Sequence, residues 1–231
     1  MIRVIAFDLD DTLWHVDPVI RRAEGVLKAW LEDRVSGFVY DRQQIGGYRH
    51  AVVEEQPELV GRMTDFRRAV LDRALAAHGV AVSPRAEILD EAIEVFLTAR
   101  NEIEFFEGVL ETIATLAEDF TLGALSNGNA DIHRLGLAGH FSFAFSAEDV
   151  GSPKPAPDLF HAALDHIGCK PEEMVYVGDD PVKDVDASNA VGIHSIWLQN
   201  TLRPGPGETS PDAVIEDIRQ LPQVMAALIA R

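Results

Sequence analysis

The segment Asp8–Thr12, with the sequence DLDDT, places three carboxylates within four residues near the N-terminus. It follows an almost wholly apolar run, Ile2–Phe7, which is typical of a strand buried on both faces. Carboxylates this close together repel one another unless a cation joins them, and oxygen ligands favour Mg²⁺. Taken by itself, the segment is equally compatible with a solvated acidic loop.

Three later polar segments each follow a short apolar run of the same kind. They are Ser126–Asn129 after Phe120–Leu125, Lys154 after Phe141–Phe145, and Gly178–Asp184 after Met174–Val177. Singly, these segments could be a polar turn, a surface lysine and a helix N-terminus with acidic caps. If the runs are parallel strands, their carboxyl ends share one edge of a sheet, and the segments form one site. It would hold a carboxylate nucleophile, a second carboxyl, a hydroxyl, an ammonium and a cation site, the set that phosphoryl transfer to an aspartate requires.

The alternation of apolar runs with helical patterns predicts an α/β core with a parallel sheet. Two further runs, His194–Leu198 and Ala213–Ile215, add candidate strands. A helix with one apolar face is expected to end at Gly168, since glycine is a common helix terminator. The segment Arg203–Gly207, with the sequence RPGPG, predicts a loop.

A long helical stretch without a convincing strand separates the first run from the second. We therefore expect a Rossmann-like core formed by residues 1–15 and 105–231, and an inserted all-helical cap domain over residues 16–104. Ser83 and Pro84 predict a helix start, with Ser83 as N-cap and Pro84 at the first helical position. The expected cap helices cover Val19–Val35, Met63–His78 and Ser83 to about Arg100. The aromatic residues of this stretch are expected mainly in its core.

The composition argues against several classes of function. The 231 residues include 38 acidic and 20 basic ones, which gives a formal charge of −18. Such a surface repels phosphate backbones and anionic headgroups, so we expect neither nucleic-acid nor membrane partners. The single cysteine, Cys169, cannot form an internal disulfide. No secretion signal is recognised at the N-terminus, and we expect a cytoplasmic protein that is a monomer or a homodimer.

Together the four polar segments resemble the signature of the haloacid dehalogenase-like hydrolase superfamily, and the helical insertion resembles that family's first type of cap. The matches, in chain order, are Asp8-x-Asp10-x-Thr12, Ser126, Lys154 and Gly178-Asp179-x-x-x-x-Asp184. The resemblance implies a Mg²⁺-dependent hydrolase acting on a small phosphorylated metabolite. Several blocks are also similar to bacterial phosphatases for flavin mononucleotide and for 5-amino-6-(5-phosphoribitylamino)uracil. These blocks are Phe7–Trp14 followed by Pro18–Glu24, then Leu125–Ala130, and Val177–Asp180.

The resemblance implies a catalytic role for four residues. Asp8 would attack phosphorus and form an aspartyl-phosphate, and Asp10 would be the acid and base that serves the leaving oxygen and then the water. Ser126 would hydrogen-bond a phosphoryl oxygen, and Lys154 would offset the charge of nucleophile and phosphate.

The same resemblance implies the metal and substrate contacts. Asp10 would bind Mg²⁺ through its backbone carbonyl, and Asp184 through water. The implied metal-binding residues are Asp8, Asp10, Asp179 and Asp184, and the implied substrate-binding residues are Asp11, Thr12 and Asn127. Asp11 is interpreted as a solvated turn residue and Asp180 as an outer-sphere group.

Two alternatives to a phosphatase stay open. The first is a 2-haloacid dehalogenase of the same fold, but family dehalogenases lack the second aspartate of the first motif, which is present here as Asp10. The second, from a different class, is a phospho-accepting receiver module, for which a helical cap would be superfluous.

Overall fold

The computed structural model describes residues 1–202 and 205–230. The chain divides into two compact units: Met1–Val16 with Glu104–Arg231, called the core unit here, and Asp17–Ile103, called the cap unit. The domain limits expected from the sequence, after residue 15 and before residue 105, stay a prediction. No helix in the described part of the chain is both long and apolar enough to cross a bilayer.

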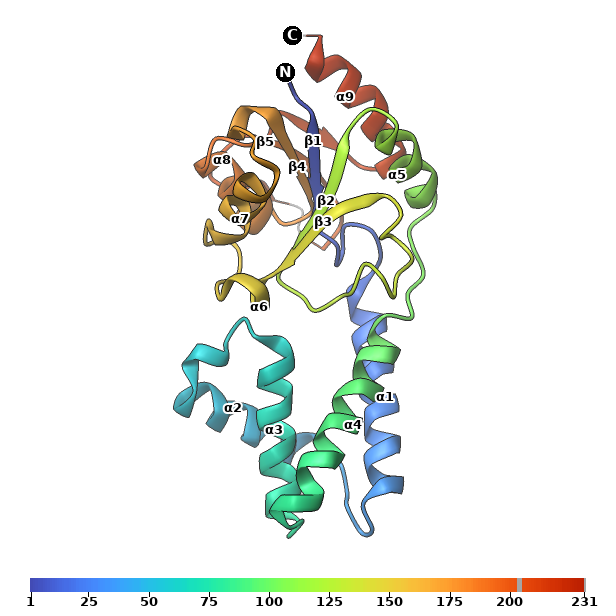
Figure 1. Ribbon diagram of the computed structural model, residues 1–231, viewed down its shortest axis with the longest axis vertical. Coiled ribbons are helices and arrows are strands. Elements are labelled where there is room, and N and C mark those ends of the chain that lie inside the picture. The colour runs from blue at the N-terminus through green and yellow to red at the C-terminus, as the bar shows by residue number, and fades with distance from the viewer. Residues whose placement is uncertain (203–204, 231) are drawn as a thin grey trace. The chain divides into compact units, whose positions relative to one another are not determined.

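The core unit is built on a six-stranded sheet in which every neighbouring pair is parallel (Figure 1). The strand order is β3-β2-β1-β4-β5-β6, the order of a Rossmann-like fold. The strands are β1 Val4–Phe7, β2 Thr121–Ser126, β3 Phe141–Ser146, β4 Met174–Gly178, β5 His194–Leu198 and β6 Ala213–Ile215. The expected α/β fold class is confirmed, and each apolar run singled out in the sequence contains a strand.

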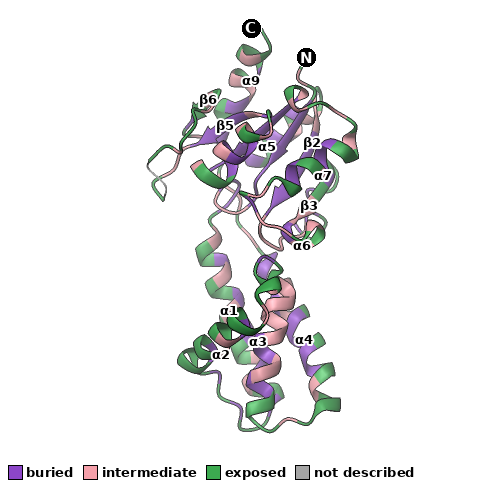
Figure 2. Ribbon diagram, turned by 90° about the vertical axis from the view of Figure 1, so that its left-hand side faces the viewer, coloured by how far each residue is buried: buried purple, intermediate pink, exposed green. Residues whose placement is uncertain are grey.

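Helices cover both faces of the sheet. Val4 and Ala6 of β1 pack in one cluster with residues of α7, so the alternate residues Ile5 and Phe7 point to the opposite face. All four are fully buried, and the strands are accordingly coloured as buried in Figure 2. The core-unit helices are α5 Val109–Ala117, α6 Ala147–Val150, α7 Asp158–Ile167, α8 Ala187–Ala190 and α9 Leu221–Ile229. Helix α7 ends at Gly168 in the left-handed conformation, as expected.

The position of β1 in the sheet determines where a site can form. Strand β1 lies between β2 and β4, so the chain leaves it toward one half of the sheet and returns on its other side. Such a reversal opens a crevice beyond the carboxyl ends of the strands, where ligands bind in open α/β sheets. The polar segments after β1, β2 and β4 therefore meet at this crevice.

The cap unit is helical throughout its regular structure, as expected. Its helices are α1 Val16–Arg34, α2 Arg42–Glu55, α3 Met63–Ala77 and α4 Val82–Arg100. Helix α2 was not expected; Asp41 caps it by accepting a hydrogen bond from the backbone N–H of Gln44 at 2.8 Å. The expected N-cap at Ser83 is wrong, because α4 begins at Val82 and its N-cap is Ala81, two residues earlier. Of the loop expected at 203–207, residues 203 and 204 lie outside the described residues.

A charged group stands inside the cap unit, beside its apolar cluster. Glu24 of α1 accepts hydrogen bonds from Arg67 Nη1 at 2.5 Å and from the Tyr40 hydroxyl at 2.8 Å. The guanidinium of Arg67 also lies 3.4 Å from the centroid of the Phe96 ring. Burial by itself would raise the pKa of Glu24, but the charge and hydrogen bond of Arg67 outweigh it and lower that pKa below its ordinary value.

We predict that Glu24→Gln destabilises the cap unit by about 1–3 kcal/mol at neutral pH, because a charge-assisted hydrogen bond is lost. A lowered folded-state pKa contributes stability that is present above the ordinary value of 4.5 and is lost as the pH falls through the folded-state pKa. The difference between wild type and variant should therefore shrink below pH 4.5. Urea unfolding across this range measures it. Glu91→Gln, which removes an exposed ion pair with Arg34, should change stability far less, and equal effects would contradict the prediction.

Candidate active site

The centre of the site is a buried ammonium held by two carboxylates from opposite ends of the chain. Lys154 Nζ donates to Asp8 Oδ1 at 2.8 Å and to Asp184 Oδ1 at 2.7 Å. It also donates to the hydroxyl of Tyr176 at 2.5 Å, and that hydroxyl donates to the backbone carbonyl of Leu125 at 2.7 Å. Asp8 directly follows β1, and Tyr176 lies on the neighbouring strand β4. The sheet thus sets the spacing between the nucleophile candidate and its counter-charge.

A third carboxylate completes the cluster. Single ligand atoms of Asp8, Asp179 and Asp184 lie within 4.8 Å of one another, and all three residues are buried. With one ammonium against three carboxylates, the group has an excess of two negative charges when fully ionised. That balance, and a donor set made only of carboxylate oxygens, fits a divalent cation of the Mg²⁺ type. In the described part of the chain, the carboxylate of Asp10 is not a member of this cluster.

The electrostatics of the cluster follow from this charge imbalance. Burial raises the pKa of Asp8 against the opposing charge of Lys154, and the charge of Asp10 raises it further. Burial also raises the pKa of Asp184, to about 6, again against Lys154. Burial alone would lower the pKa of Lys154, but the charges of Asp184 and Asp8 raise it well above its ordinary value. The ammonium therefore keeps its charge, whereas burial disfavours the charged form of the two carboxylates.

Asp179 is oriented by three residues from two other segments, the loop after β1 and the end of β5. Its Oδ1 accepts from the Thr12 hydroxyl at 3.4 Å, and its Oδ2 accepts from the Asn200 side-chain amide at 3.1 Å. Its backbone carbonyl accepts from the Trp197 indole N–H at 2.9 Å. Thr12 is fully buried with its hydroxyl on Asp179, and its expected contact with substrate stays a prediction.

Gly178 makes room for Asp184. A Cβ atom built on Gly178 would lie 2.4 Å from Cγ and from Oδ2 of Asp184, far closer than real contacts allow. Asp184 Oδ2 in turn accepts from the backbone N–H of Asp180 at 2.8 Å. Glycine is therefore required before Asp179 for a steric reason, because the backbone there passes directly beneath the carboxylate of Asp184, which binds Lys154.

Two residues after β2 shape the other side of the site. The Ser126 hydroxyl is buried and accepts from the backbone N–H of Gly128 at 3.0 Å. Asn127 forms two hydrogen bonds with the backbone of Lys154: its amide donates to the carbonyl at 2.9 Å, and its side-chain oxygen accepts from the N–H at 2.7 Å. The side chain of Asn127 therefore fixes the lysine loop.

The two additional aspartates have local structural roles. Asp11 has a left-handed backbone, with φ of 63°, and its carboxylate accepts from the Val16 backbone N–H at 3.0 Å, at the start of α1. Asp180 caps the π-helical turn Pro181–Asp186, because its Oδ1 accepts from the N–H groups of Val182 and Lys183, each at 3.0 Å. Asp11 is thus more than a solvated turn residue, and Asp180 fixes the turn that carries Asp184.

Three residues of the site were not recognised in the sequence. Tyr176 lies in the apolar run of β4 and Trp197 in that of β5, so the sequence pattern identifies both only as core residues. Asn200 follows β5, and its position after a parallel strand is a signal that could have found it. The hydrogen-bonding ends of the two aromatic side chains gave no sequence signal.

Comparison with known proteins defines the family. The model of the haloacid dehalogenase-like hydrolases matches residues 2–192. The chain belongs to this family, and the match covers β1 to α8, hence all four segments of the site.

Named relatives include phosphatases and dehalogenases. The chain is 28% identical to the 5-amino-6-(5-phospho-D-ribitylamino)uracil phosphatase YigB of Escherichia coli, over 86% of this chain and 84% of that protein. It is 36% identical to the phosphoserine phosphatase of Thermus thermophilus, over 95% and 97%. Among solved structures, a 2-haloacid dehalogenase from Pseudomonas syringae superposes with a TM-score of 0.94 at 38% identity, covering 99% of this chain and all of that one.

We predict that Gly178→Ala destabilises the protein by about 1–3 kcal/mol, because the added methyl group must displace Asp184 from Lys154. Denaturant unfolding followed by circular dichroism measures the change. Gly47→Ala is the matched control: a Cβ there meets no atom within 4 Å, and removal of a helical glycine should stabilise α2 by up to about 1 kcal/mol. Equal stability of the Gly178 variant and the wild type would contradict the steric role given to this glycine.

Proposed function

We propose that this hydrolase is a Mg²⁺-dependent phosphatase that cleaves a small phosphorylated metabolite through an aspartyl-phosphate. The observation that carries the proposal is the buried contact of 2.8 Å between Lys154 and Asp8, within a cluster that contains Asp179 and Asp184. Such a cluster offers an oxygen nucleophile beside a fixed positive charge and a cation site, which phosphoryl transfer needs.

In the first half of the reaction, a carboxylate oxygen of Asp8 attacks phosphorus, and the bond from phosphorus to the leaving oxygen breaks. Asp10 donates its proton to that oxygen, so that an alcohol leaves. The charge of Asp10 helps to raise the pKa of Asp8, which supports the proposal that the two carboxyl groups lie close enough to act on the same phosphate ester. In this step Asp8 must be ionised and Asp10 protonated.

In the second half, Asp10, now a carboxylate, takes a proton from a water molecule that attacks the aspartyl-phosphate. The bond between phosphorus and Asp8 breaks, inorganic phosphate leaves, and the nucleophile is regenerated. Lys154 offsets the charge on the phosphoryl oxygens in both halves, and the Ser126 hydroxyl donates to one of them. The short bonds of Lys154 to two carboxylates support this role because they hold the ammonium in place before substrate arrives.

A divalent cation would be held by Asp8, Asp179 and Asp184, with Asp10 contributing its backbone carbonyl and Asp184 acting through water. When bound, it supplies positive charge that lets a phosphate dianion approach the carboxylates. The hydrogen bonds from Thr12 and Asn200 orient Asp179 for this purpose.

A second candidate function is 2-haloacid dehalogenation, which the name of the Pseudomonas syringae structure favours. The presence of Asp10 favours the phosphatase, because a halide needs no proton on leaving, whereas an alkoxide does. The named relatives from Escherichia coli and Thermus thermophilus support the same choice. Within the phosphatases, we propose flavin mononucleotide or a riboflavin-pathway precursor as the substrate, and phosphoserine is the comparison compound that a relative suggests.

We predict that wild-type protein with Mg²⁺ releases phosphate continuously from p-nitrophenyl phosphate and from one of these three metabolites. Asp8→Asn should lower turnover by at least about 1,000-fold while the fold persists, because the amide has nearly the same shape and is a poor nucleophile. Phosphate release measures turnover, and circular dichroism monitors the fold. Retention of a tenth of the activity would show that another residue attacks. Chloride release from 2-chloropropionate without metal would establish the dehalogenase instead.

Exchange of Mg²⁺ for Ca²⁺ should lower the rate of phosphate release by about tenfold or more. Calcium takes more oxygen ligands at longer distances, and small displacements of the reacting groups strongly reduce the rate of an in-line attack. Steady-state assays of one enzyme preparation, stripped of metal and reloaded with each ion, compare the two. Equal rates with both ions would contradict a role for a six-coordinate cation.

A further inference from the structure

The negative charge of this protein is distributed unevenly between its two units. Residues 17–103 contain 12 basic and 15 acidic residues, whereas the remainder of the chain contains 8 basic and 23 acidic ones. The cap unit is therefore close to neutral in a strongly acidic chain. The acidic residues of the cap unit therefore do not cancel the positive potential of a local group of cations on it.

Such a group surrounds a cavity of about 340 Å³ between α1 and α2. Helix α1 lines it with Arg21, Glu24, Gly25 and Lys28, and helix α2 lines it with Arg42, Ile45, Gly46 and Arg49. Ile20 and Tyr40 complete the lining. Four cations and one carboxylate thus face a common space that also has an apolar wall.

The two helices present the same pattern to the cavity. On α1 the cations Arg21 and Lys28 are seven residues apart, with Gly25 between them; α2 repeats this spacing around Gly46. Residues i, i+4 and i+7 share one face of a helix, and seven residues rise by about 10 Å. Each helix therefore carries two positive charges about 10 Å apart, separated by a position without a side chain.

Packing does not account for these glycines. A Cβ atom on Gly25 or on Gly46 would meet nothing within 4 Å, and neither residue has the left-handed backbone that favours glycine. A glycine inside a helix costs about 1 kcal/mol relative to alanine. Because they have no side chain, Gly25 and Gly46 leave open the space between the two cations of their helix.

The cations of α1 are paired on their own helix, Arg21 with Asp17 at 2.7 Å and Lys28 with Glu32 at 3.8 Å, so the two arginines of α2 are the groove cations that are available to a ligand. Among residues 1–202 and 205–230, no carboxylate oxygen lies within 4.0 Å of the guanidinium groups of Arg42 or Arg49. Glu24, the single carboxylate in the lining, already accepts hydrogen bonds from Arg67 and from Tyr40. The hydrogen-bonding positions of Glu24 are thus directed to Arg67 and Tyr40, although the charge of Arg49 also contributes to the lowered pKa of Glu24.

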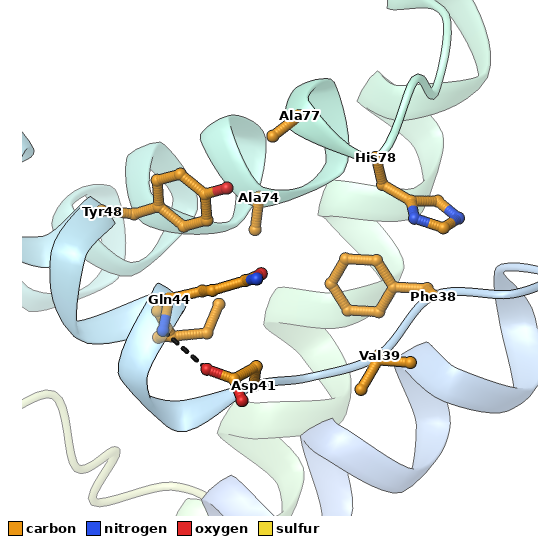
Figure 3. A pocket seen from close by; sticks show the side chains of 9 residues that line it. Phe38, Val39, Asp41, Gln44, Tyr48, Ala74, Ala77 and His78 are labelled. Carbon is orange, nitrogen blue, oxygen red and sulfur yellow. Dashed lines mark hydrogen bonds between the residues drawn. The ribbon is translucent and has the colours of Figure 1, made fainter.

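The cations are confined to one side of α2. The other side lines a separate pocket, shown in Figure 3, where Gln44 lies between Tyr48 and Phe38. None of the described residues lining that pocket is a lysine or an arginine, and Asp41 is a carboxylate. An anion that binds next to α2 is therefore directed to the side that faces α1.

We propose that the groove between α1 and α2 binds a small organic molecule with two anionic groups, phosphate or carboxylate, about 10 Å apart. The planar guanidinium groups of Arg42 and Arg49 hold the two anionic groups by paired hydrogen bonds. The apolar middle of the ligand packs on Ile20 and Ile45 across the open glycine positions. The inference rests on the cap unit alone and is independent of the proposed phosphatase activity.

Calorimetric titration of the full-length protein with 1,6-hexanebisphosphonate and with suberate tests the proposal, since neither compound contains a hydrolysable phosphate ester. We expect saturable binding of at least one of them, weakened about 10–100-fold in Arg42→Gln and in Arg49→Gln. The bisphosphonate and the dicarboxylate distinguish phosphate from carboxylate recognition. Hexylphosphonate, with a single anionic group, should bind at least about tenfold more weakly than the bisphosphonate.

Two matched controls separate the groove from general charge effects. Arg68→Gln removes the same charge from the cap unit at an exposed pair with Asp90, and should change affinity less than about twofold. Gly46→Leu should block the groove, whereas Gly47→Leu, equally free of neighbours but absent from the lining, should not. Absence of binding by both compounds, equal loss in Arg68→Gln, or unchanged binding in Gly46→Leu would overturn the proposal. Asp8→Asn should bind as wild type does, so failure of the phosphatase would leave this result unaffected.

Discussion

A single buried ammonium is the constraint around which the core unit is arranged. Lys154 is almost wholly buried and satisfies its three donor positions with Asp8, Asp184 and Tyr176. Removal of Lys154 from this group would leave uncompensated buried carboxylates, and breaking a buried ion pair in this way costs about 3–5 kcal/mol. The carboxylates depend on the lysine in turn, because burial raises the pKa of Asp8 and of Asp184 and the charge of Lys154 opposes that rise. The loops after β1, β3 and β4 are therefore held together by one electrostatic group that is also the proposed reaction centre.

The parallel sheet is what makes this arrangement possible. Asp8 continues β1, and its backbone N–H donates to the carbonyl of Val177 on β4 at 2.9 Å, so the two strand ends are in register. Gly178 then lets the turn that carries Asp184 pass close to the strand end. Asp8 and Lys154 are separated by 146 positions in sequence. They come within hydrogen-bond distance because each lies in a short segment that follows a strand of the same sheet. The residues of the candidate site lie in the loops after the strands, and the strand order determines which of these loops are close enough to form one site.

The sequence predicted those features whose signal lies within one short segment. Buried parallel strands appear as continuous apolar runs, and the polar residues directly after them identify the edge of the sheet. Helix α2 was not predicted because Gly46 and Gly47 lower its helical propensity. Its N-cap, Asp41, is a single residue and therefore a weak sequence signal. Tyr176 escaped because an aromatic residue in an apolar run gives no sign that its hydroxyl ends on a charge. Tertiary hydrogen bonds of this kind depend on partners far away in the chain.

The distribution of charge links the two units in physical terms. The core unit carries most of the acidic residues, so the proposed phosphatase would admit an anion only where Lys154 and a bound cation locally reverse the sign of the field. The cap unit is nearly neutral and gathers four cations at one groove, two of which are paired with carboxylates of their own helix. By the proposed mechanism, anion recognition in the core unit depends on metal supply, whereas recognition in the proposed groove site depends only on arginine and lysine side chains. Chelation of divalent cations would separate the two, because it removes the first and leaves the second intact.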